Sequence, residues 1–374
     1  MSKNEANGFD SHIITDTLGQ DKQYDLLVFI GRFSPLHLGH QRVIDIALQR
    51  SKKVLVLVGS TNSARTLRNP FKYEERYAMI ASQYEAVIEN KRLIIDGIED
   101  YTYAEDMWIQ QVQTKINKNS NGNDVVGLIG CEKDHTSYYL GLFPHLHNVG
   151  VEFKIPLNST DVRKAVFFQY HGWQDKGPAG GNEFWDYLDS ACAPEVSKML
   201  HGFMYTKVYE EIREEWKWIE DYRAKRQTSN YPVIDVTVDA CVVQSGHVLV
   251  VKRKHRPGKG LYALPGGFLN VDEPIHYAQL RELREETCID LSDTILRANM
   301  VKQEVFSNPK RSDRGRIITH ACLIKLQDRK VLPKVKGADD AESAFWLKLS
   351  DVKPEDFFED HGHIIRYLVG AYSN

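Results

Sequence analysis

Residues 26–40 of this 374-residue chain read LLVFIGRFSPLHLGH. The first five residues are all apolar, which favours a strand that is buried on both faces, as in a parallel sheet. Gly31 ends this run, and an amphipathic helical pattern follows from residue 41 to residue 50. The segment between them therefore joins a buried strand to a helix. It lies at the carboxyl end of the strand, where open α/β sheets bind their ligands.

The same alternation of short apolar runs and helical patterns continues along the chain. Five strands alternating with helices predict a doubly wound α/β layer. A glycine-rich turn is expected near residues 172–181. The further strands are expected at residues 54–58, 93–95, 125–129 and 151–155, and the helices at residues 73–87, at residues 105–116 and from residue 159.

The pattern of the sequence changes in the second half of the chain. A β-hairpin is expected around Ser245-Gly246, and a helix at residues 275–287 lies between further strands, which predicts a mixed α+β domain. The chain is also longer than the roughly 250–300 residues at which single cores stop growing. We therefore predict a flexible tail at residues 1–23, a first domain at 24–193, a helical connector at 194–230 and a second domain at 231–374.

Composition limits the classes of function. The chain is 42% hydrophobic and 26% charged with a formal net charge of −3, which argues against a dedicated nucleic-acid binder. No apolar run approaches the roughly 20 residues that span a bilayer, so no membrane partner is expected. The polar N-terminal segment does not have the pattern of a signal peptide. Five scattered cysteines without a Cys-x-x-Cys pair fit reduced thiols, so we expect a cytoplasmic protein.

Two imidazoles are placed at the expected start of the first helix. His37 and His40 lie on either side of Gly39, which lets a phosphate approach the backbone closely. A helix N-terminus presents unpaired N–H groups and the positive end of a dipole, and Arg32 adds a charge. The alternative is a pair of loop histidines that cap the helix. Neither the Walker A pattern nor G-x-G-x-x-G occurs in this segment.

A second segment, residues 156–163, reads PLNSTDVR and opens another expected helix. Ser159 or Thr160 can serve as the N-cap of that helix. The same hydroxyl and N–H groups can bind phosphate, with Arg163 facing it from the next turn. An ordinary helix cap without a ligand is the alternative.

The string Gly-x-Phe-x-Pro-x-His-x-Gly-His at residues 31–40 resembles the signature of the nucleotidylyltransferase superfamily. In that superfamily a Ser/Thr-x-x-Arg helix start binds the triphosphate of ATP. The block from residue 24 to about residue 168 further resembles nicotinamide-mononucleotide adenylyltransferase of the archaeal type. This resemblance rests on GRF at residues 31–33, NPF at 69–71 with Glu75-Arg76, Asp100-Tyr101 followed by Trp108, and GCEKD at 130–134.

The resemblance implies a Rossmann-like domain that transfers AMP from ATP to nicotinamide mononucleotide, giving NAD and pyrophosphate. Catalysis then rests on positioning and charge stabilisation, with Mg²⁺ bridging the phosphates. Arg76 is alternatively an ion-pair partner of Glu75, and Trp108 is either a core aromatic or the ring that stacks on nicotinamide. Nicotinic acid mononucleotide and a phosphopantetheine remain open as acceptors. The implied catalytic residues are His37, His40 and Arg163, and the implied substrate contacts are Gly31, Arg32, Phe33, Gly39, Arg76, Trp108, Lys133, Asp134, Ser159 and Thr160.

Residues 267–289 read GFLNVDEPIHYAQLRELREETCI and bring carboxylates together. On a helix, Glu282, Glu285 and Glu286 share one face, where like charges destabilise the helix unless a cation neutralises them. Carboxylate oxygens select Mg²⁺ or Mn²⁺, and a backbone carbonyl at Gly267 can join them. A solvated acidic face is the alternative.

The pattern G-x₅-E-x₇-R-E-L-x-E-E resembles the Nudix box residue for residue. It implies an α/β/α sandwich in which a metal-activated water attacks a nucleoside diphosphate derivative. Glu285 and Glu286 are the implied catalytic groups, and Gly267 with Glu282 completes the metal set. The box normally has a glycine where this chain has Cys288, at a helix end where positive φ is common. We interpret Cys288 as a small buried hydrophobic residue.

The flank at residues 306–316 resembles the Nudix half of bacterial fusions of these two domains, which implies hydrolysis of ADP-ribose to AMP and ribose 5-phosphate. Arg311, Arg314 and Arg316 then hold the diphosphate, with a solvated basic loop as the alternative. Asp340 or Glu342 is a candidate base or outer metal ligand. The implied partners are ATP, nicotinamide mononucleotide and ADP-ribose, with self-association as in one-domain members. A Nudix domain that only senses ADP-ribose, or that cleaves another nucleoside diphosphate derivative, remains an alternative.

Overall fold

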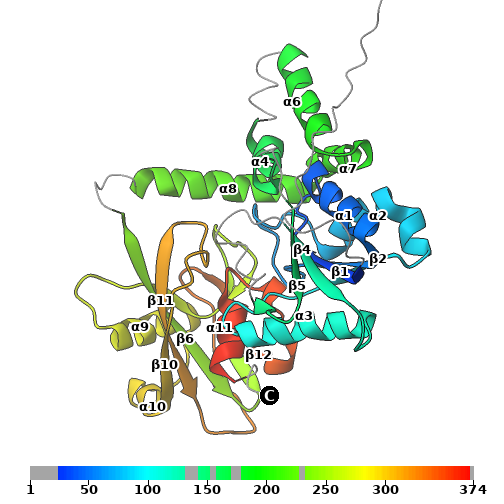
Figure 1. The fold of residues 1–374 in the computed structure, drawn as a ribbon. Coiled ribbons are helices and arrows are strands. Elements are labelled where there is room, and N and C mark those ends of the chain that lie inside the picture. Colours follow the sequence, from blue (N-terminus) through cyan, green and yellow to red (C-terminus); the bar gives the residue numbers. More distant parts are fainter. Residues whose placement is uncertain (1–23, 131–141, 152–156, 170–177, 227–231, 371–374) are drawn as a thin grey trace, which may run out of the picture. The chain divides into compact units, whose positions relative to one another are not determined.

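The computed structural model describes residues 24–130, 142–151, 157–169, 178–226 and 232–370 (Figure 1). The chain forms two compact units. The N-terminal unit contains the residues up to 59 together with 73–98 and 112–200. The C-terminal unit contains residues 60–72, 99–111 and 201–374.

The N-terminal unit is built on a five-stranded parallel sheet, in the order β3-β2-β1-β4-β5, which confirms the predicted Rossmann-like layer. Residues 54–58 are 0% exposed, as expected for a strand that is covered on both faces. The strands are β1 (Tyr24–Gly31), β2 (Ser51–Val58), β3 (Leu93–Gly97), β4 (Val126–Gly130) and β5 (His147–Gly150). The helices of this half of the chain are α1 (Leu38–Arg50), α2 (Tyr73–Glu89), α3 (Glu105–Asn119), α4 (Ser159–Lys164), the π-helix η2 (Ala165–Gln169) and α6 (Pro178–Ala191).

Two predicted elements of this half need comment. A strand was expected at residues 151–155, of which residues 152–155 lie outside the described part of the chain. The strand β5 at His147–Gly150 directly precedes them and was not predicted, because its residues HNVG form no apolar run. The glycine-rich turn was expected to extend to residue 181, but residues 178–181 form the start of α6. Pro178 suits this position, since proline is pre-organised for the first turn of a helix.

The C-terminal unit contains a mixed sheet in the order β10-β11-β6-β7-β12, with β8 paired to β7 and β9 paired to β6. The pair of β6 and β11 is parallel, and the other pairs are antiparallel. The strands are β6 (Ile234–Gln244), β7 (His247–Arg253), β8 (Tyr262–Ala263), β9 (Gly266–Phe268), β10 (Met300–Phe306), β11 (Arg316–Lys325) and β12 (Ala341–Lys348). The helices are α9 (Ile275–Thr287), α10 (Asp293–Ala298), η3 (Leu349–Asp351), η4 (Pro354–Asp356) and α11 (His361–Leu368).

Two apolar clusters cover the two faces of this sheet. Ala240 and Val242 of β6 pack with Leu280 and Leu283 of α9. The alternate residues of β6, including Cys241, pack with residues of α11. Because neighbouring side chains of a strand point to opposite faces, α9 and α11 lie on opposite faces of the sheet, which gives the predicted α/β/α sandwich.

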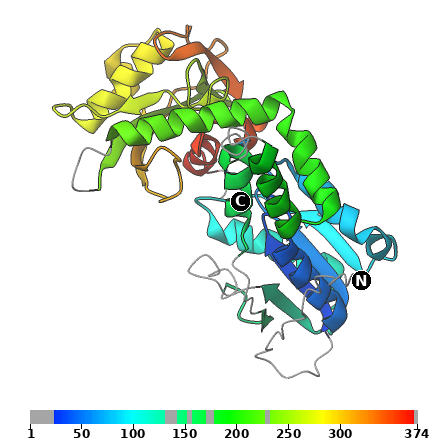
Figure 2. The same cartoon turned by 90° about the horizontal axis from the view of Figure 1, so that it is seen from above.

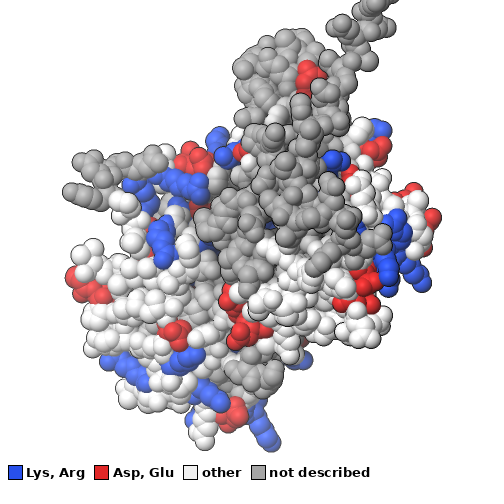
Figure 3. All heavy atoms as spheres, in the orientation of Figure 1, with Lys and Arg blue, Asp and Glu red and all other residues white. Residues whose placement is uncertain are grey.

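Two helices form most of the predicted connector at residues 194–230, whose role between domains stays a prediction. They are α7 (Pro194–Met204) and α8 (Lys207–Arg226), and α8 belongs to the C-terminal unit. The long green helix in Figure 2 is α8. Figure 3 shows blue and red side chains interspersed on the face it displays, in line with a net charge of −3. Within the described residues, no helix is both long enough and apolar enough to cross a bilayer.

Candidate active sites

The first candidate site lies where β1 leads into α1. His37 is the N-cap of α1, and its carbonyl accepts the N–H groups of His40 (2.9 Å) and Gln41 (3.1 Å). The rings of His37 and His40 stack with their centroids 3.7 Å apart. A Cβ atom on Gly39 would lie 2.9 Å from Cε1 of His37, so this close stacking requires glycine. The structure thus places both predicted imidazoles side by side at a helix N-terminus, which is the geometry that suits phosphate.

The ring of Phe33 packs against this pair of histidines. Its ring is 0% exposed and lies 4.9 Å from the ring of His40 and 5.2 Å from the ring of Phe29. A Cβ atom on Gly31 would come within 3.0 Å of the Phe33 ring, so Gly31 makes room for it. The ring of Phe33 is thus part of the core, and the predicted contact of Phe33 with substrate stays a prediction. Arg32, in contrast, has an exposed side chain.

The second phosphate segment begins one residue earlier than predicted. Asn158 is the N-cap of α4, and its side-chain oxygen accepts the N–H of Asp161 at 3.0 Å. The assignment of Ser159 or Thr160 as the cap was therefore wrong. The reason is the extended backbone of Asn158, which places its short amide over the first turn. Both hydroxyl residues consequently lie inside the first turn of the helix.

The structure brings the two predicted segments together. Arg163 is 7% exposed and donates to the carbonyl oxygen of Ser34 at 2.6 Å. Its other terminal nitrogen donates to Oγ1 of Thr160 at 3.1 Å. The hydroxyl of Ser159 donates to the carbonyl oxygen of Pro35 at 3.1 Å. Side-chain bonds from α4 thus fix the loop that carries the histidines.

Arg76 has a role that neither sequence alternative covers. Its side chain is 1% exposed, and one terminal nitrogen donates to the carbonyl oxygens of Arg32 (2.9 Å) and Gly59 (2.6 Å). Arg76 therefore ties together the ends of β1 and β2. The phosphate contact predicted for Arg76 stays a prediction.

Three other predicted substrate contacts remain predictions. Trp108 lies in the first turn of α3 and is half-buried, which fits both a packing role and a stacking role. Lys133 and Asp134 lie outside the described residues.

The second candidate site is the carboxylate face of α9. Glu286 is 7% exposed, its Oε2 accepts the N–H of Gly266 at 3.0 Å, and burial raises its pKa to about 8. Burial also raises the pKa of Glu282. Glu285 lies further out, with 45% of its side chain exposed. The two buried carboxylates therefore pay a desolvation penalty that a bound cation would remove.

Arg281 organises this face in a way that the sequence analysis missed. Its guanidinium binds Glu282 at 2.8 Å, Glu285 at 2.9 Å and Glu273 at 2.8 Å, and these hydrogen bonds hold the pKa of Arg281 above its usual value. Among the residues described, no three His, Cys, Asp or Glu side chains converge as a metal site. The predicted set of three glutamates is therefore not assembled here, since Arg281 binds two of them.

The chemistry of the donors still fits a divalent cation. A Cβ atom on Gly267 would lie 2.5 Å from Oε1 of Glu282, so only glycine allows the backbone to approach this carboxylate so closely. Carboxylate and backbone oxygens are the ligands that Mg²⁺ and Mn²⁺ prefer. Glu282, Glu286 and the main chain at Gly267 are thus the groups suited to hold one.

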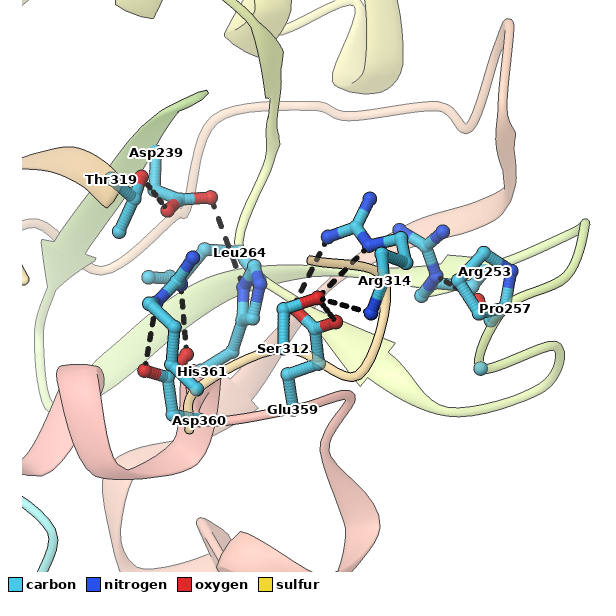
Figure 4. A network of polar contacts seen from close by, with 12 residues as sticks. Asp239, Arg253, Pro257, Leu264, Ser312, Arg314, Thr319, Glu359, Asp360 and His361 are labelled. Atoms are coloured by element: carbon cyan, nitrogen blue, oxygen red, sulfur yellow. Dashed lines mark hydrogen bonds and ion pairs between the residues drawn. The ribbon is translucent and has the colours of Figure 1, made fainter. Parts of the chain in front are cut away.

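A buried acid next to this site was missed by the sequence analysis. Asp239 of β6 is 3% exposed, and its Oδ2 accepts the hydroxyl of Thr319 at 2.5 Å (Figure 4). A Cβ atom on Gly266 would lie 2.4 Å from Oδ1 of Asp239. Burial raises the pKa of Asp239. The only signal in the sequence was one acid within the apolar run of an expected strand.

The three predicted diphosphate-binding arginines have different surroundings. Arg311 binds both carboxylate oxygens of Asp360, at 3.0 and 2.8 Å, and only 2% of its side chain is exposed. The charge of Arg311 is thus balanced by Asp360, and its contact with diphosphate stays a prediction. Arg314 binds Glu359 at 3.1 Å and Ser312 at 3.2 Å. Arg316 is half-exposed and donates to the carbonyl oxygen of Ser307 at 2.7 Å.

Three remaining residues were also assigned from the sequence. Glu342 forms a surface ion pair with Lys252 at 3.1 Å, and Asp340 is exposed. Cys288 ends α9 with φ 44° and ψ 36°, the left-handed conformation for which the usual glycine is suited. Its side chain is exposed, so the interpretation of Cys288 as a buried residue was wrong.

Comparisons with known proteins match each half of the chain to a known family. The cytidylyltransferase-like family model matches residues 28–136, and the NUDIX domain model matches residues 234–368. The crystal structure of a bifunctional NMN adenylyltransferase/ADP ribose pyrophosphatase from Francisella tularensis is 35% identical in sequence. It covers 94% of this chain and 100% of its own, with a TM-score of 0.84. The chain belongs to this bifunctional family.

Family membership confirms the two predicted enzyme classes, a nucleotidyltransferase and a Nudix hydrolase of NAD metabolism. A second Francisella tularensis structure, complexed with AMP and a manganese ion, is 34% identical, covers 94% of this chain and 100% of its own, and has a TM-score of 0.82. A relative from Acinetobacter baylyi, a nicotinamide/nicotinic acid mononucleotide adenylyltransferase, is 32% identical over 52% of this chain and 95% of its own length. Both enzyme classes generally use divalent metal ions.

Proposed function

We propose that this chain catalyses two reactions with separate sites. The first transfers AMP from ATP to nicotinamide mononucleotide, giving NAD and pyrophosphate. The second hydrolyses ADP-ribose to AMP and ribose 5-phosphate with Mg²⁺ or Mn²⁺. The observation that carries this proposal is the presence of both sites on one chain that matches a bifunctional enzyme over 94% of its length. The proposed domains are residues 24–193 and 231–374, joined by the connector at 194–230.

In the first reaction, the 5′-phosphate of the mononucleotide attacks the α-phosphorus of ATP, and pyrophosphate leaves. No protein nucleophile is needed, so the residues act by positioning and by stabilising charge on the phosphates. His37 and His40 face the phosphates from the start of α1. Ser159, Thr160 and Arg163 serve the leaving pyrophosphate, and Arg32 adds a charge. A divalent cation, when bound, neutralises phosphate charge.

Recognition of the nicotinamide ring is assigned to Trp108, whose indole face attracts the pyridinium cation. Lys133 and Asp134 retain their proposed role in substrate binding. The amide mononucleotide is the proposed acceptor. The Acinetobacter baylyi relative is named for both the amide and the acid form, so the acid form is the second acceptor to test.

In the second reaction, a water attacks a phosphorus of the diphosphate and releases AMP and ribose 5-phosphate. Glu282, Glu286 and the backbone at Gly267 are proposed to hold the divalent cation, with Glu285 at the outer edge. That cation supplies Lewis acidity when it is bound. Arg311, Arg314 and Arg316 remain the proposed contacts for the diphosphate. The retained carboxylates Glu282 and Glu286 favour hydrolysis over a sensor role.

Two incubations of the purified protein with Mg²⁺ test this proposal. One contains ATP and nicotinamide mononucleotide, the other contains ADP-ribose, and products are separated by chromatography. We expect NAD in the first and AMP in the second. His40→Ala should lower only NAD synthesis and Glu286→Gln only hydrolysis, each by roughly 10²–10³-fold. Survival of ADP-ribose with the unaltered chain would reject the hydrolase assignment, and absence of NAD would reject the acceptor.

A further inference from the structure

The loop at Leu264-Pro265 leads into β9, whose first residues Gly266 and Gly267 bring the main chain against the carboxylates of the Nudix site. The N–H of Gly266 donates to Glu286 at 3.0 Å, and Gly267 is packed so closely against Glu282 that a Cβ atom would lie 2.5 Å from its Oε1. The carbonyl of Pro265 accepts the N–H of Ala240 at 2.9 Å. The position of this loop therefore sets where backbone groups stand relative to both glutamates.

A histidine from the last helix fixes the start of this loop. His361 is the first residue of α11 and is 7% exposed. Its Nδ1 accepts the backbone N–H of Leu264 at 3.0 Å, across 97 positions of sequence (Figure 4). A ring nitrogen that accepts a hydrogen bond carries no proton, so this imidazole is neutral with its proton on Nε2. Burial lowers the pKa of His361 to about 4, which agrees with this state.

The nearby carboxylate of Asp239 does not change this assignment. Its Oδ1 lies 3.8 Å from Nδ1 of His361, too far for a hydrogen bond. The other oxygen of Asp239 is already bound to Thr319. With a neutral ring, the contact between Asp239 and His361 is not an ion pair, and the bond to Leu264 is the directed interaction of Nδ1.

Hydrogen bonds of the neighbouring residues hold the chain segment that carries His361. Asp360, the residue before it, binds Arg311 through two hydrogen bonds, and Tyr103 also donates to Asp360. The N–H of Phe358 donates to the carbonyl of Tyr262 at 2.8 Å. These contacts anchor the start of α11 independently of the loop. His361 is thus a fixed point for the main chain that enters β9, in addition to the pairing of β9 with β6.

We propose that His361 is a positioning residue of the Nudix site, which acts through Leu264 to hold Gly266 and Gly267 beside Glu286 and Glu282. This inference rests on the proposed cation-dependent hydrolysis at that face. His361 touches neither carboxylate through a hydrogen bond, so its effect is on the arrangement of the cation ligands. Groups that orient metal ligands typically change metal affinity or activity by roughly 10–100-fold when they are removed.

Two substitutions separate positioning from simple packing. His361→Asn keeps an acceptor oxygen close to the place of Nδ1, whereas His361→Leu keeps the bulk and removes the acceptor. His363→Leu is the matched control, because His363 is 6% exposed and lies on the same helix. Binding of Mn²⁺ to each full-length variant is measured by electron paramagnetic resonance. The Mg²⁺ dependence of ADP-ribose hydrolysis and the rate of NAD synthesis are measured in parallel.

We expect His361→Leu to weaken Mn²⁺ binding by roughly 10-fold or more, with His361→Asn close to the unaltered protein. NAD synthesis should be unchanged in all three variants, and circular dichroism with thermal unfolding checks that the Nudix domain of each variant is folded. Equal Mn²⁺ affinity in all variants, or equal losses in the Asn and Leu variants, would overturn the proposal. If the unaltered chain binds Mn²⁺ but leaves ADP-ribose intact, the proposed substrate fails while the ranking of Mn²⁺ affinities still tests His361.

Discussion

The two candidate sites differ in how the protein balances their charges. In the first, buried guanidinium groups donate to main-chain carbonyls, as Arg163 does to Ser34 and Arg76 to Gly59. In the second, burial raises the pKa of Glu286 and Asp239, which lie next to the same glycine. The buried guanidinium groups of the first site are therefore already bound to main-chain carbonyls, whereas the second site carries desolvated carboxylates whose charge a bound cation can balance.

The largest expected effect tests the first site, by removing one of its buried guanidinium groups. Arg163→Met should lower NAD synthesis by roughly 10²–10³-fold, because it removes a charge from the phosphate site and frees the loop at Ser34. ADP-ribose hydrolysis should be unaffected. Lys164→Met is the control, since Lys164 is the exposed neighbour on the same helix. Comparable losses in both variants would show that general charge, and not the buried bonds, governs the first site.

The buried carboxylates of the second site should make the stability of the protein depend on pH. The pKa of Glu286 is raised to about 8 in the folded chain, so the folded state binds a proton that the unfolded state has released. Burial lowers the pKa of His361 and His363 to about 4, so these two residues contribute a rise in stability between about pH 4 and 6.5. Glu286 should contribute the opposite slope, a fall in the stability of the metal-free protein as pH rises from about 4.5 towards 8. Asp239, whose pKa is also raised, adds a slope of the same sign.

Thermal unfolding in a chelator across this pH range measures the effect. Glu286→Gln should remove the contribution of Glu286 to the pH dependence of stability, and Mg²⁺ should reduce that contribution in the unaltered protein. Glu285→Gln is the matched control, because that side chain is 45% exposed and has little desolvation to relieve. A slope that survives Glu286→Gln unchanged would mean that the buried carboxylate is not its source.

The smallest expected effect concerns the end of α9. Cys288 has φ 44°, where a side chain costs about 1–2 kcal/mol and glycine costs nothing extra in the folded state. Cys288→Gly should therefore raise stability by about 1 kcal/mol after the greater backbone entropy of glycine in the unfolded chain is counted. Denaturant unfolding compares it with Cys288→Ala, which keeps a Cβ atom. Equal stability of the two variants would exclude backbone strain as the cause.

The sequence predicted those features that depend on neighbouring residues. Apolar runs identified the parallel strands, helical spacing placed Leu280 and Leu283 in the core, and the two motifs located both sites. Contacts between distant segments were not predictable, because nothing near Arg76 in sequence identifies a carbonyl 17 residues away as its partner. For the same reason the partner of Arg311 was missed.

Local competition explains the other errors. Asn158, Ser159 and Thr160 are all good cap residues, so only the backbone conformation decides among them. The edge strand β5 has few apolar residues, and its position was fixed by pairing with β4 instead of by composition.

The exposed thiol at the end of α9 also offers a practical opportunity. Within the described part of the chain, Cys192, Cys241 and Cys322 are buried and Cys288 is exposed. Thiol-selective dyes react at accessible sulfur atoms, so a fluorophore can be attached two residues after Glu286. Its emission would report on the surroundings of the carboxylate helix as ions arrive and leave. Loading of the hydrolase could then be followed as an optical time course on the intact two-site protein.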